Sequence, residues 1–181
     1  MPSKNLIRAL QYAAQQHSPQ RRKDEAQSPY INHPIVLMHI LNIEAGIDDE
    51  DVLIAALLHD VMEDCSGPHQ MFIEDRRREI GEQFGAIVLS YVEAVTDDKT
   101  IDKNSRKRAQ VEKGTSKPLG AKLVKIADKI ANLRDIKNAP PANWNEERKA
   151  EYFRWANEVV GQLRGSHEKL EALFDEVAIT P

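Results

Sequence analysis

The chain has 181 residues, of which 41% are hydrophobic and 30% charged, a balance typical of one soluble globular domain. Its formal net charge of −4 gives no global signal for nucleic-acid binding, and its longest apolar run, residues 52–58, is too short to span a bilayer. A single cysteine, Cys65, excludes an intrachain disulfide and, with an N-terminus that lacks an export-like segment, favours a cytoplasmic protein.

Apolar residues recur at steps of three and four through most of the chain, and this spacing predicts amphipathic helices. The predicted helices cover, in chain order, about residues 6–14, 34–46, 48–64, 87–96, 103–113, 121–138, 146–165 and 166–177. Pro34 suits the first turn of the second helix and Gly46 its end, whereas the acidic residues 48–51 suit the start of the third. No segment alternates with a period of two, and no long linker divides the chain. We therefore expect an all-α fold, a single bundle of about eight or nine helices that spans residues 1–181.

The third predicted helix ends in AALLHDVMED, residues 55–64, where polar side chains follow a strongly apolar run. Residues four apart share one face of a helix, so His59 would lie above Glu63 and Asp60 above Asp64. Carboxylates in a buried helix are costly unless they are paired or bind a cation. Exposed acids at the end of a helix are the simpler explanation when this segment is taken alone.

Two further polar features lie in apolar surroundings. Asp128 and Asn132 stand one turn apart in KIADKIANLRD. A surface ion pair of Asp128 with Lys125 or Lys129 would also explain this aspartate. His33 stands at the junction into a helix in INHP, where a capping or half-buried histidine is the ordinary finding.

Together, His33, the doublet His59–Asp60 and Asp128 would bring two nitrogen and two oxygen ligands from three helices. Such a set suits Mn²⁺, Fe²⁺ or Zn²⁺ and leaves positions for water or a substrate oxygen. Glu63 and Asp64 would stand one turn away, where a carboxylate can orient or deprotonate a water molecule. The remaining histidines, which lack comparable surroundings in the sequence, are His17, His39, His69 and His167.

An ordered series of longer motifs goes beyond the His-Asp doublet. The series reads, in chain order, RRKDEAQSPYINHP, AALLHDVMED, FGAIVLSYVEAVTDDKT, GAKLVKIADKIANLRD and EYFRWA. It closely resembles the HD-type hydrolase domain of the RelA/SpoT family, and most of all its free-standing small alarmone hydrolases, which include the metazoan SpoT homologue. The resemblance covers roughly residues 5–175.

The resemblance implies an all-helical, Mn²⁺-dependent enzyme that removes the 3′-diphosphate of (p)ppGpp and releases pyrophosphate and GDP or GTP. The positions that match the family's metal ligands are His33, His59, Asp60 and Asp128. Glu63 and Asp64 match its catalytic acidic pair, and spacing does not tell which of them takes the proton. The positions that match its substrate contacts are Arg22, Lys23, Lys103, Asn132, Arg148 and Tyr152.

The sequence departs from the family pattern between the acidic pair and the FG motif. The segment CSGPHQMFIEDRRREIGEQFG is several residues longer than usual, and Cys65 stands where a threonine is common. We expect a loop at CSGPHQ and expect the insertion at 66–79, with Arg76–Arg78, to decorate the surface rather than to shape the entrance to the site.

Two other functions fit the same residues. One is removal of phosphate from another ribose-phosphate nucleotide, such as the 2′-phosphate of NADPH, since metazoan relatives share that chemistry. The other is a non-catalytic HD domain that binds nucleotides or partner helices, although such a domain would be expected to lack a ligand or an acidic residue. The expected partner is thus a small nucleotide rather than a nucleic acid or a membrane, and the sequence does not set the oligomeric state.

Overall fold

A computed structural model describes residues 3–65 and 70–179, and in these ranges the fold is all-α, as predicted. No strand occurs among them, and their β-type pairing is limited to an isolated bridge between Arg21 and Pro29. The helices of the first half are α1 (Lys4–Gln16), α2 (Asn32–His39), the π-helical turn η1 (Ile40–Glu44), α3 (Glu50–Leu58), α4 (Val61–Asp64) and α5 (Gln70–Phe84). Those of the second half are α6 (Ala86–Val95), α7 (Lys103–Glu112), α8 (Leu119–Asn138), α9 (Glu146–Gly161) and α10 (Glu168–Ala178). With η1 counted as the end of α2 and α4 as a continuation of α3, the described residues form nine helices, which confirms the expected number.

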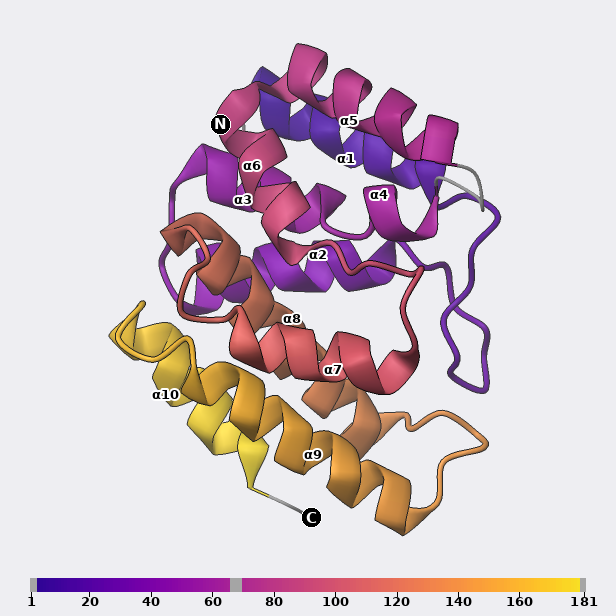
Figure 1. The fold of residues 1–181 in the computed structure, drawn as a ribbon, viewed down its shortest axis with the longest axis vertical. Helices are drawn as coiled ribbons and strands as arrows, with labels where there is room; N and C mark the ends of the chain where they lie inside the picture. Colours follow the sequence, from indigo (N-terminus) through magenta and orange to yellow (C-terminus); the bar gives the residue numbers. More distant parts are fainter. Residues whose placement is uncertain (1–2, 66–69, 180–181) are drawn as a thin grey trace.

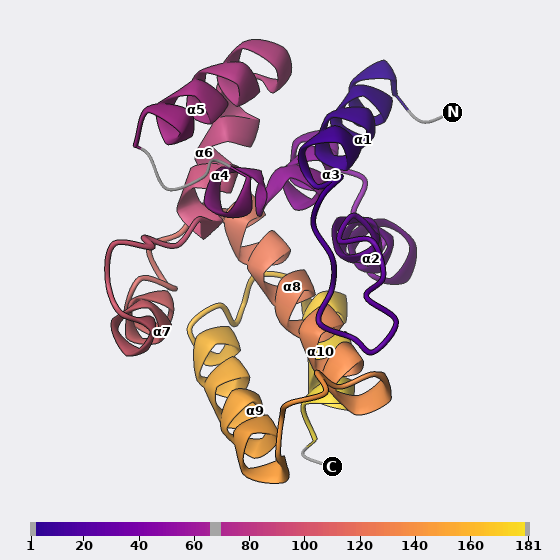
Figure 2. The ribbon, with the colours of Figure 1, turned by 90° about the vertical axis from the view of Figure 1, so that its right-hand side faces the viewer.

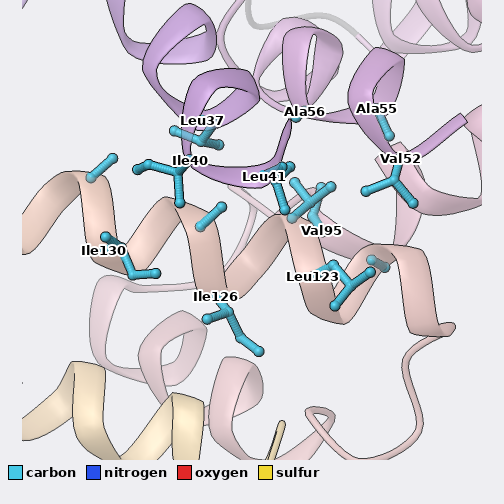
Figure 3. Packing of buried hydrophobic residues seen from close by; sticks show 14 of the residues in the cluster. Leu37, Ile40, Leu41, Val52, Ala55, Ala56, Val95, Leu123, Ile126 and Ile130 are labelled. Atoms are coloured by element: carbon cyan, nitrogen blue, oxygen red, sulfur yellow. The ribbon is translucent and has the colours of Figure 1, made fainter. Parts of the chain in front are cut away.

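The longest helix, α8, runs through the middle of the molecule, and α1 and α10 lie towards opposite ends of the long axis (Figures 1 and 2). It packs against α2, α3, α6, α9 and α10. Leu37, Ile40 and Leu41 lie on one side of α8, whereas the side chain of Ile126 points to the opposite side, and all four belong to one buried cluster (Figure 3). Residues 123–131 are all buried, because other helices cover α8 on several sides. None of the described helices is long and apolar enough to cross a membrane.

The segment expected as one helix from 48 to 64 is divided in the structure. Asp49 begins α3 by accepting hydrogen bonds from the backbone N–H groups of Asp51 and Val52. The helix ends at Leu58, and His59 and Asp60 form a turn before α4 begins. Asp60 has φ −100° and ψ −3°, which interrupts the regular helical backbone. The prediction of a continuous helix was therefore wrong at the two residues that carry the HD doublet.

The insertion contains a helix that the sequence reading missed. Residues 66–69, which include most of the loop expected at CSGPHQ as well as His69, lie outside the described residues. From Gln70 the chain forms α5, which packs against α4 and α6. Ile80 is fully buried, and Ile73 and Phe84 pack against the core, so apolar residues at helical spacing do mark this helix.

Candidate active site

Three of the four expected metal ligands meet at the junction of two helical segments. His33 lies in the first turn of α2, and His59 and Asp60 form the turn between α3 and α4. One ligand atom from each side chain lies within 4.8 Å of the other two. Both imidazole rings are buried, with centroids 5.4 Å apart. The break in the helix after Leu58 therefore lies at the centre of the site.

The hydrogen bonding of His59 fits a metal ligand. Its Nδ1 lies 2.9 Å from the carbonyl oxygen of Ala56, and since a carbonyl only accepts, Nδ1 carries the proton. In the neutral ring Nε2 then has a lone pair that faces Asp60 Oδ2 at 2.8 Å. Burial lowers the pKa of His59, but the Asp60 carboxylate outweighs it and raises this pKa above its ordinary value. His59 Nε2 and Asp60 Oδ2 both carry lone pairs, so at this distance a proton or a cation must lie between them. The bond from Nδ1 to the Ala56 carbonyl also fits, because histidine ligands of metals commonly donate their other N–H to a backbone carbonyl.

Asp128, the fourth expected ligand, comes from the middle of α8 and lies beside His33. Its Oδ1 lies 3.3 Å from His33 Nε2 and accepts a hydrogen bond from Asn132 at 2.6 Å. Lys129 Nζ lies 3.1 Å from Oδ2, and burial, which would raise the pKa of Asp128, is outweighed by this ammonium group, so the pKa is well below its usual value. Asp128 and Lys129 are 9% and 2% exposed, so they form a buried ion pair. The sequence had offered a surface ion pair as the alternative explanation.

The two acidic residues of α4 have different surroundings. Asp64 accepts a hydrogen bond from Gln20 Nε2 at 3.1 Å and forms an ion pair with Lys99. Glu63 accepts a hydrogen bond from the backbone N–H of Asp97 at 3.2 Å, and Lys99 lies 3.8 Å away. Burial, reinforced by nearby aspartates, raises the pKa of Glu63 to about 7. Glu63 is thus the carboxyl group better suited to exchange a proton near neutral pH.

Two adjoining cavities of about 480 and 340 Å³ meet at this cluster. The first extends towards the loop before α2 and the end of α8, and the second towards α7 and α9. All six residues expected to contact substrate line one or both cavities. Those that line both are Arg22, Lys23, Asn132 and Tyr152, and those that line the second are Lys103 and Arg148.

Positive charge is concentrated in the second cavity beyond what the sequence reading identified. Arg106 and Lys107 of α7 line it together with the expected Lys103 and Arg148. Lys103 is exposed, but a partial loss of hydration, together with the nearby charges of Arg148 and Lys107, lowers its pKa. Arg106 and Lys107 lie three and four residues after Lys103, so helical spacing within KNSRKR could have identified them. Such a concentration of cations favours an anionic ligand.

Aromatic rings form one side of the cavities. Trp144 lines both, and its ring centroid lies 5.6 Å from that of Tyr152, which in turn lies 5.2 Å from that of Trp155. The Arg148 guanidinium lies 4.5 Å from the Trp144 ring centroid. Sequence reasoning missed Trp144 because nothing local to APPANW distinguishes a site residue from a packing residue. The rings are inclined to one another by 51° and 73°, so a heterocyclic base could stack on the face of one of them rather than on all three.

The arginines of the insertion lie apart from both cavities. Arg76 pairs with Glu79, Arg77 with Glu74 and Glu93, and Arg78 with Asp75. None of the three lines either cavity. Arg77 and Arg78 are exposed, as expected of a surface insertion, whereas Arg76 is half-buried.

Comparison with known proteins gives the family. The HD-domain profile matches residues 9–154. The MESH1 guanosine-3′,5′-bis(diphosphate) 3′-pyrophosphohydrolase of Drosophila melanogaster is 45% identical over 176 residues, which is 97% of this chain and 94% of the relative. The human MESH1 of the same name is 49% identical over 166 residues, 92% of this chain and 88% of the relative.

The chain belongs to the HD-domain family, in its MESH1 group. A solved structure described as a metazoan orthologue of SpoT that hydrolyses ppGpp and plays a role in starvation responses superimposes with a TM-score of 0.89 and 45% identity. The match covers 98% of this chain and 95% of that one. Both the HD-type helical fold and the resemblance to the small alarmone hydrolases are therefore confirmed.

Proposed function

We propose that the protein is a divalent-metal-dependent hydrolase that removes the 3′-diphosphate of (p)ppGpp, with residues 1–181 acting as one domain. The observation that carries this proposal is the group of buried His33 and His59 with half-buried Asp60, beside a cavity that both the carboxylate pair and several cations line. The names of the MESH1 relatives support the substrate. One water molecule is added across the bond between the ribose 3′ oxygen and phosphorus. ppGpp therefore gives GDP and pyrophosphate, and pppGpp gives GTP and pyrophosphate.

Membership of the HD hydrolases implies a divalent metal. The residues that would hold it are His33, His59, Asp60 and Asp128, and the lone pair of His59 Nε2 facing Asp60 supports this set. Two nitrogen and two oxygen ligands suit Mn²⁺, which we propose as the metal, with Fe²⁺ and Zn²⁺ as the alternatives. When bound, the metal supplies Lewis acidity that polarises a phosphoryl oxygen and acidifies water.

Glu63 is proposed to take the proton from the attacking water. Its side chain lines the second cavity, and the Asp97 N–H binds Oε2, whereas Oε1 accepts no hydrogen bond from Lys99, 3.8 Å away, and can accept a proton. Asp64, fixed by Gln20 and Lys99, would accept a hydrogen bond from the same water and orient it. As water oxygen bonds to phosphorus, the bond from phosphorus to the ribose 3′ oxygen breaks, and that oxygen takes up a proton.

The cations of the site are proposed to balance the charge of the substrate. Arg22 and Lys23 line both cavities, whereas Lys103 and Arg148 line the second. They would offset phosphate charge as water approaches phosphorus, and Asn132 and Tyr152 would contact the nucleotide. We further propose that the protein acts in the cytoplasm on this small nucleotide rather than on nucleic acid.

Turnover of purified protein tests the proposal. ppGpp, pppGpp and NADPH are each incubated with Mn²⁺ or with EDTA, and the release of pyrophosphate and of phosphate is measured separately. We expect Mn²⁺-dependent release of pyrophosphate from the two guanosine substrates. Phosphate release from NADPH alone would replace the proposed substrate with the alternative one, and no metal-dependent release from any of the three would refute a hydrolase.

A further inference from the structure

His17 is almost completely buried, with 1% of its surface exposed, although nothing in the sequence assigned it to the site. It ends α1, and its Nδ1 lies 2.6 Å from Gln20 Oε1. Gln20 in turn donates from Nε2 to Asp64 Oδ2 at 3.1 Å. Cys65 Sγ also lies 3.3 Å from His17 Nδ1. A buried histidine is thus connected to a carboxylate of the active site through one side chain.

The direction of these hydrogen bonds follows from Asp64. An ionised carboxylate only accepts, so the NH₂ group of Gln20 faces Asp64 and its Oε1 faces His17. Because this oxygen also only accepts, His17 Nδ1 must carry the proton. Burial lowers the pKa of His17, so the ring is neutral at neutral pH and Nε2 is the unprotonated nitrogen. Nε2 is buried and has no hydrogen-bond partner among the described residues.

The backbone holds the two side chains in this arrangement. The N–H of Gln20 donates to the carbonyl of His17 at 2.9 Å, which closes a turn directly after α1. Ten residues later the N–H of Tyr30 donates to the carbonyl of Gln20 at 3.2 Å. Gln20 therefore has a fixed backbone, and its long side chain needs only one further contact to fix the amide. His17 supplies that contact.

We propose that His17 is a positioning residue of the active site, which orients the amide of Gln20 so that Gln20 holds the Asp64 carboxylate beside Glu63. His17 lines neither of the two cavities, so its effect passes through Gln20. The catalytic consequence of this arrangement rests on the proposed hydrolase function, whereas the hydrogen-bond chain itself does not.

A structural role of the His17 ring must be separated from this one. The ring lies against Tyr30, with centroids 4.8 Å apart, and the Tyr30 hydroxyl donates to Asp60 at 2.6 Å. His17→Phe keeps an aromatic ring against Tyr30 but lacks the Nδ1 donor. His17→Asn loses the ring but can place an amide N–H near the position of Nδ1. Gln20→Leu removes both polar contacts of Gln20 at similar volume.

The first test needs no activity. Long-range ¹H–¹⁵N spectra of the wild-type protein, without substrate, report which ring nitrogen of His17 carries the proton, and the signal is assigned by its absence from His17→Phe. We expect the neutral ring with the proton on Nδ1, and a changed Nδ1 signal in Gln20→Leu. A ring protonated on Nε2, or a His17 signal that Gln20→Leu leaves unchanged, would overturn the proposal.

The second test measures ppGpp turnover in variants whose folded fraction is verified by thermal unfolding. His17→Phe and Gln20→Leu should each lower kcat about tenfold with little change in KM, the scale of one lost hydrogen bond to a charged group. The double variant should be no slower than Gln20→Leu, and His17→Asn should recover most of the loss. Additive losses, or equal losses in His17→Phe and His17→Asn, would contradict action through Gln20.

The two proposals can fail separately. A wild-type protein that does not hydrolyse ppGpp would refute the proposed function, while the nitrogen spectra would still decide the hydrogen-bond chain. A wild-type protein that hydrolyses ppGpp, with His17→Phe and Gln20→Leu equally fast, would refute the positioning role alone.

Discussion

The acids of the active site, Asp60, Glu63 and Asp64, and two of the cations that line its second cavity, Lys103 and Arg148, are supported in different ways. Each acid accepts a hydrogen bond from another part of the fold: Asp60 from Tyr30, Glu63 from the Asp97 backbone and Asp64 from Gln20. Lys103 and Arg148 are exposed, and neither has an ion-pair partner among the described residues.

This difference follows from the energetics of charge. These three carboxylates are half-buried, and a carboxylate that loses part of its hydration is costly unless the fold supplies donors in return. An exposed ammonium or guanidinium group keeps most of its hydration and can exchange it for phosphate oxygens when substrate arrives. The acidic side is therefore organised in the free protein, whereas Lys103 and Arg148 would find their partners in the ligand.

Asp128→Ala should have the largest effect. Loss of this buried ligand should remove bound metal and lower turnover on the order of 10³-fold, because the metal supplies much of the charge stabilisation. Metal content by mass spectrometry and pyrophosphate release by a coupled assay measure the two quantities. Asp75→Ala, which removes a surface carboxylate of α5, is the matched control and should keep both. An Asp128→Ala protein with full activity would remove Asp128 from the proposed ligand set.

Glu63→Gln should keep the metal but lower kcat roughly 10²- to 10³-fold, the contribution expected of a general base. The amide preserves the size of the side chain and its acceptor for the Asp97 N–H, so folding should change little. Asp64→Asn provides the comparison within the pair and should lose less, since Asp64 is proposed to orient water rather than to accept its proton. The opposite order of the two losses would assign the base to Asp64.

The pH dependence of kcat should report Glu63. Burial raises the pKa of Glu63 to about 7, so the carboxylate that can accept a proton predominates above that pH and is lost as pH falls below it. Turnover should therefore fall on the acid side with a midpoint near 7. In Glu63→Gln, the residual rate should no longer fall on the acid side. Both profiles are measured from about pH 5.5 to 9 at constant ionic strength. An unchanged profile would show that another group titrates.

Substitutions on the cationic side should have smaller effects, and these should appear in KM rather than in metal content. Lys103→Ala or Arg148→Ala should raise KM about tenfold and weaken the dependence of kcat/KM on salt, since these groups are proposed to hold substrate phosphates. Metal content should stay at the wild-type level. Lys169→Ala, which removes an exposed cation of α10, is the matched control. A loss of metal in Lys103→Ala would mean that the two sides of the site are not independent.

The smallest effect is expected from a substitution in the insertion. Arg78 is 62% exposed and pairs with Asp75 on the same helix, so Arg78→Ala should leave KM and kcat within about twofold and stability within ~0.5 kcal/mol. Substrate kinetics and thermal unfolding measure both. A raised KM would place the arginines of α5 in the path of the substrate.

The sequence by itself determined the helical class and most of the helices, because apolar spacing directly encodes which face of a helix is buried. It also identified the candidate ligands, since His33, the His59–Asp60 doublet and Asp128 are polar groups in apolar surroundings whose order matches a known family. Their roles as ligands remain a prediction. The missed helix α5 carried the same type of signal in Ile73, Ile80 and Phe84.

Only the tertiary structure decided which distant groups support the acids. Gln20, Lys99 and the Asp97 backbone N–H reach Asp64 or Glu63 across 44, 35 and 34 residues of sequence, and no local pattern encodes such contacts. The same holds for His17, which sequence reading set aside and which is 1% exposed in the fold. Periodicity reports burial within one element, whereas the partner of a buried polar group depends on how separate elements pack together.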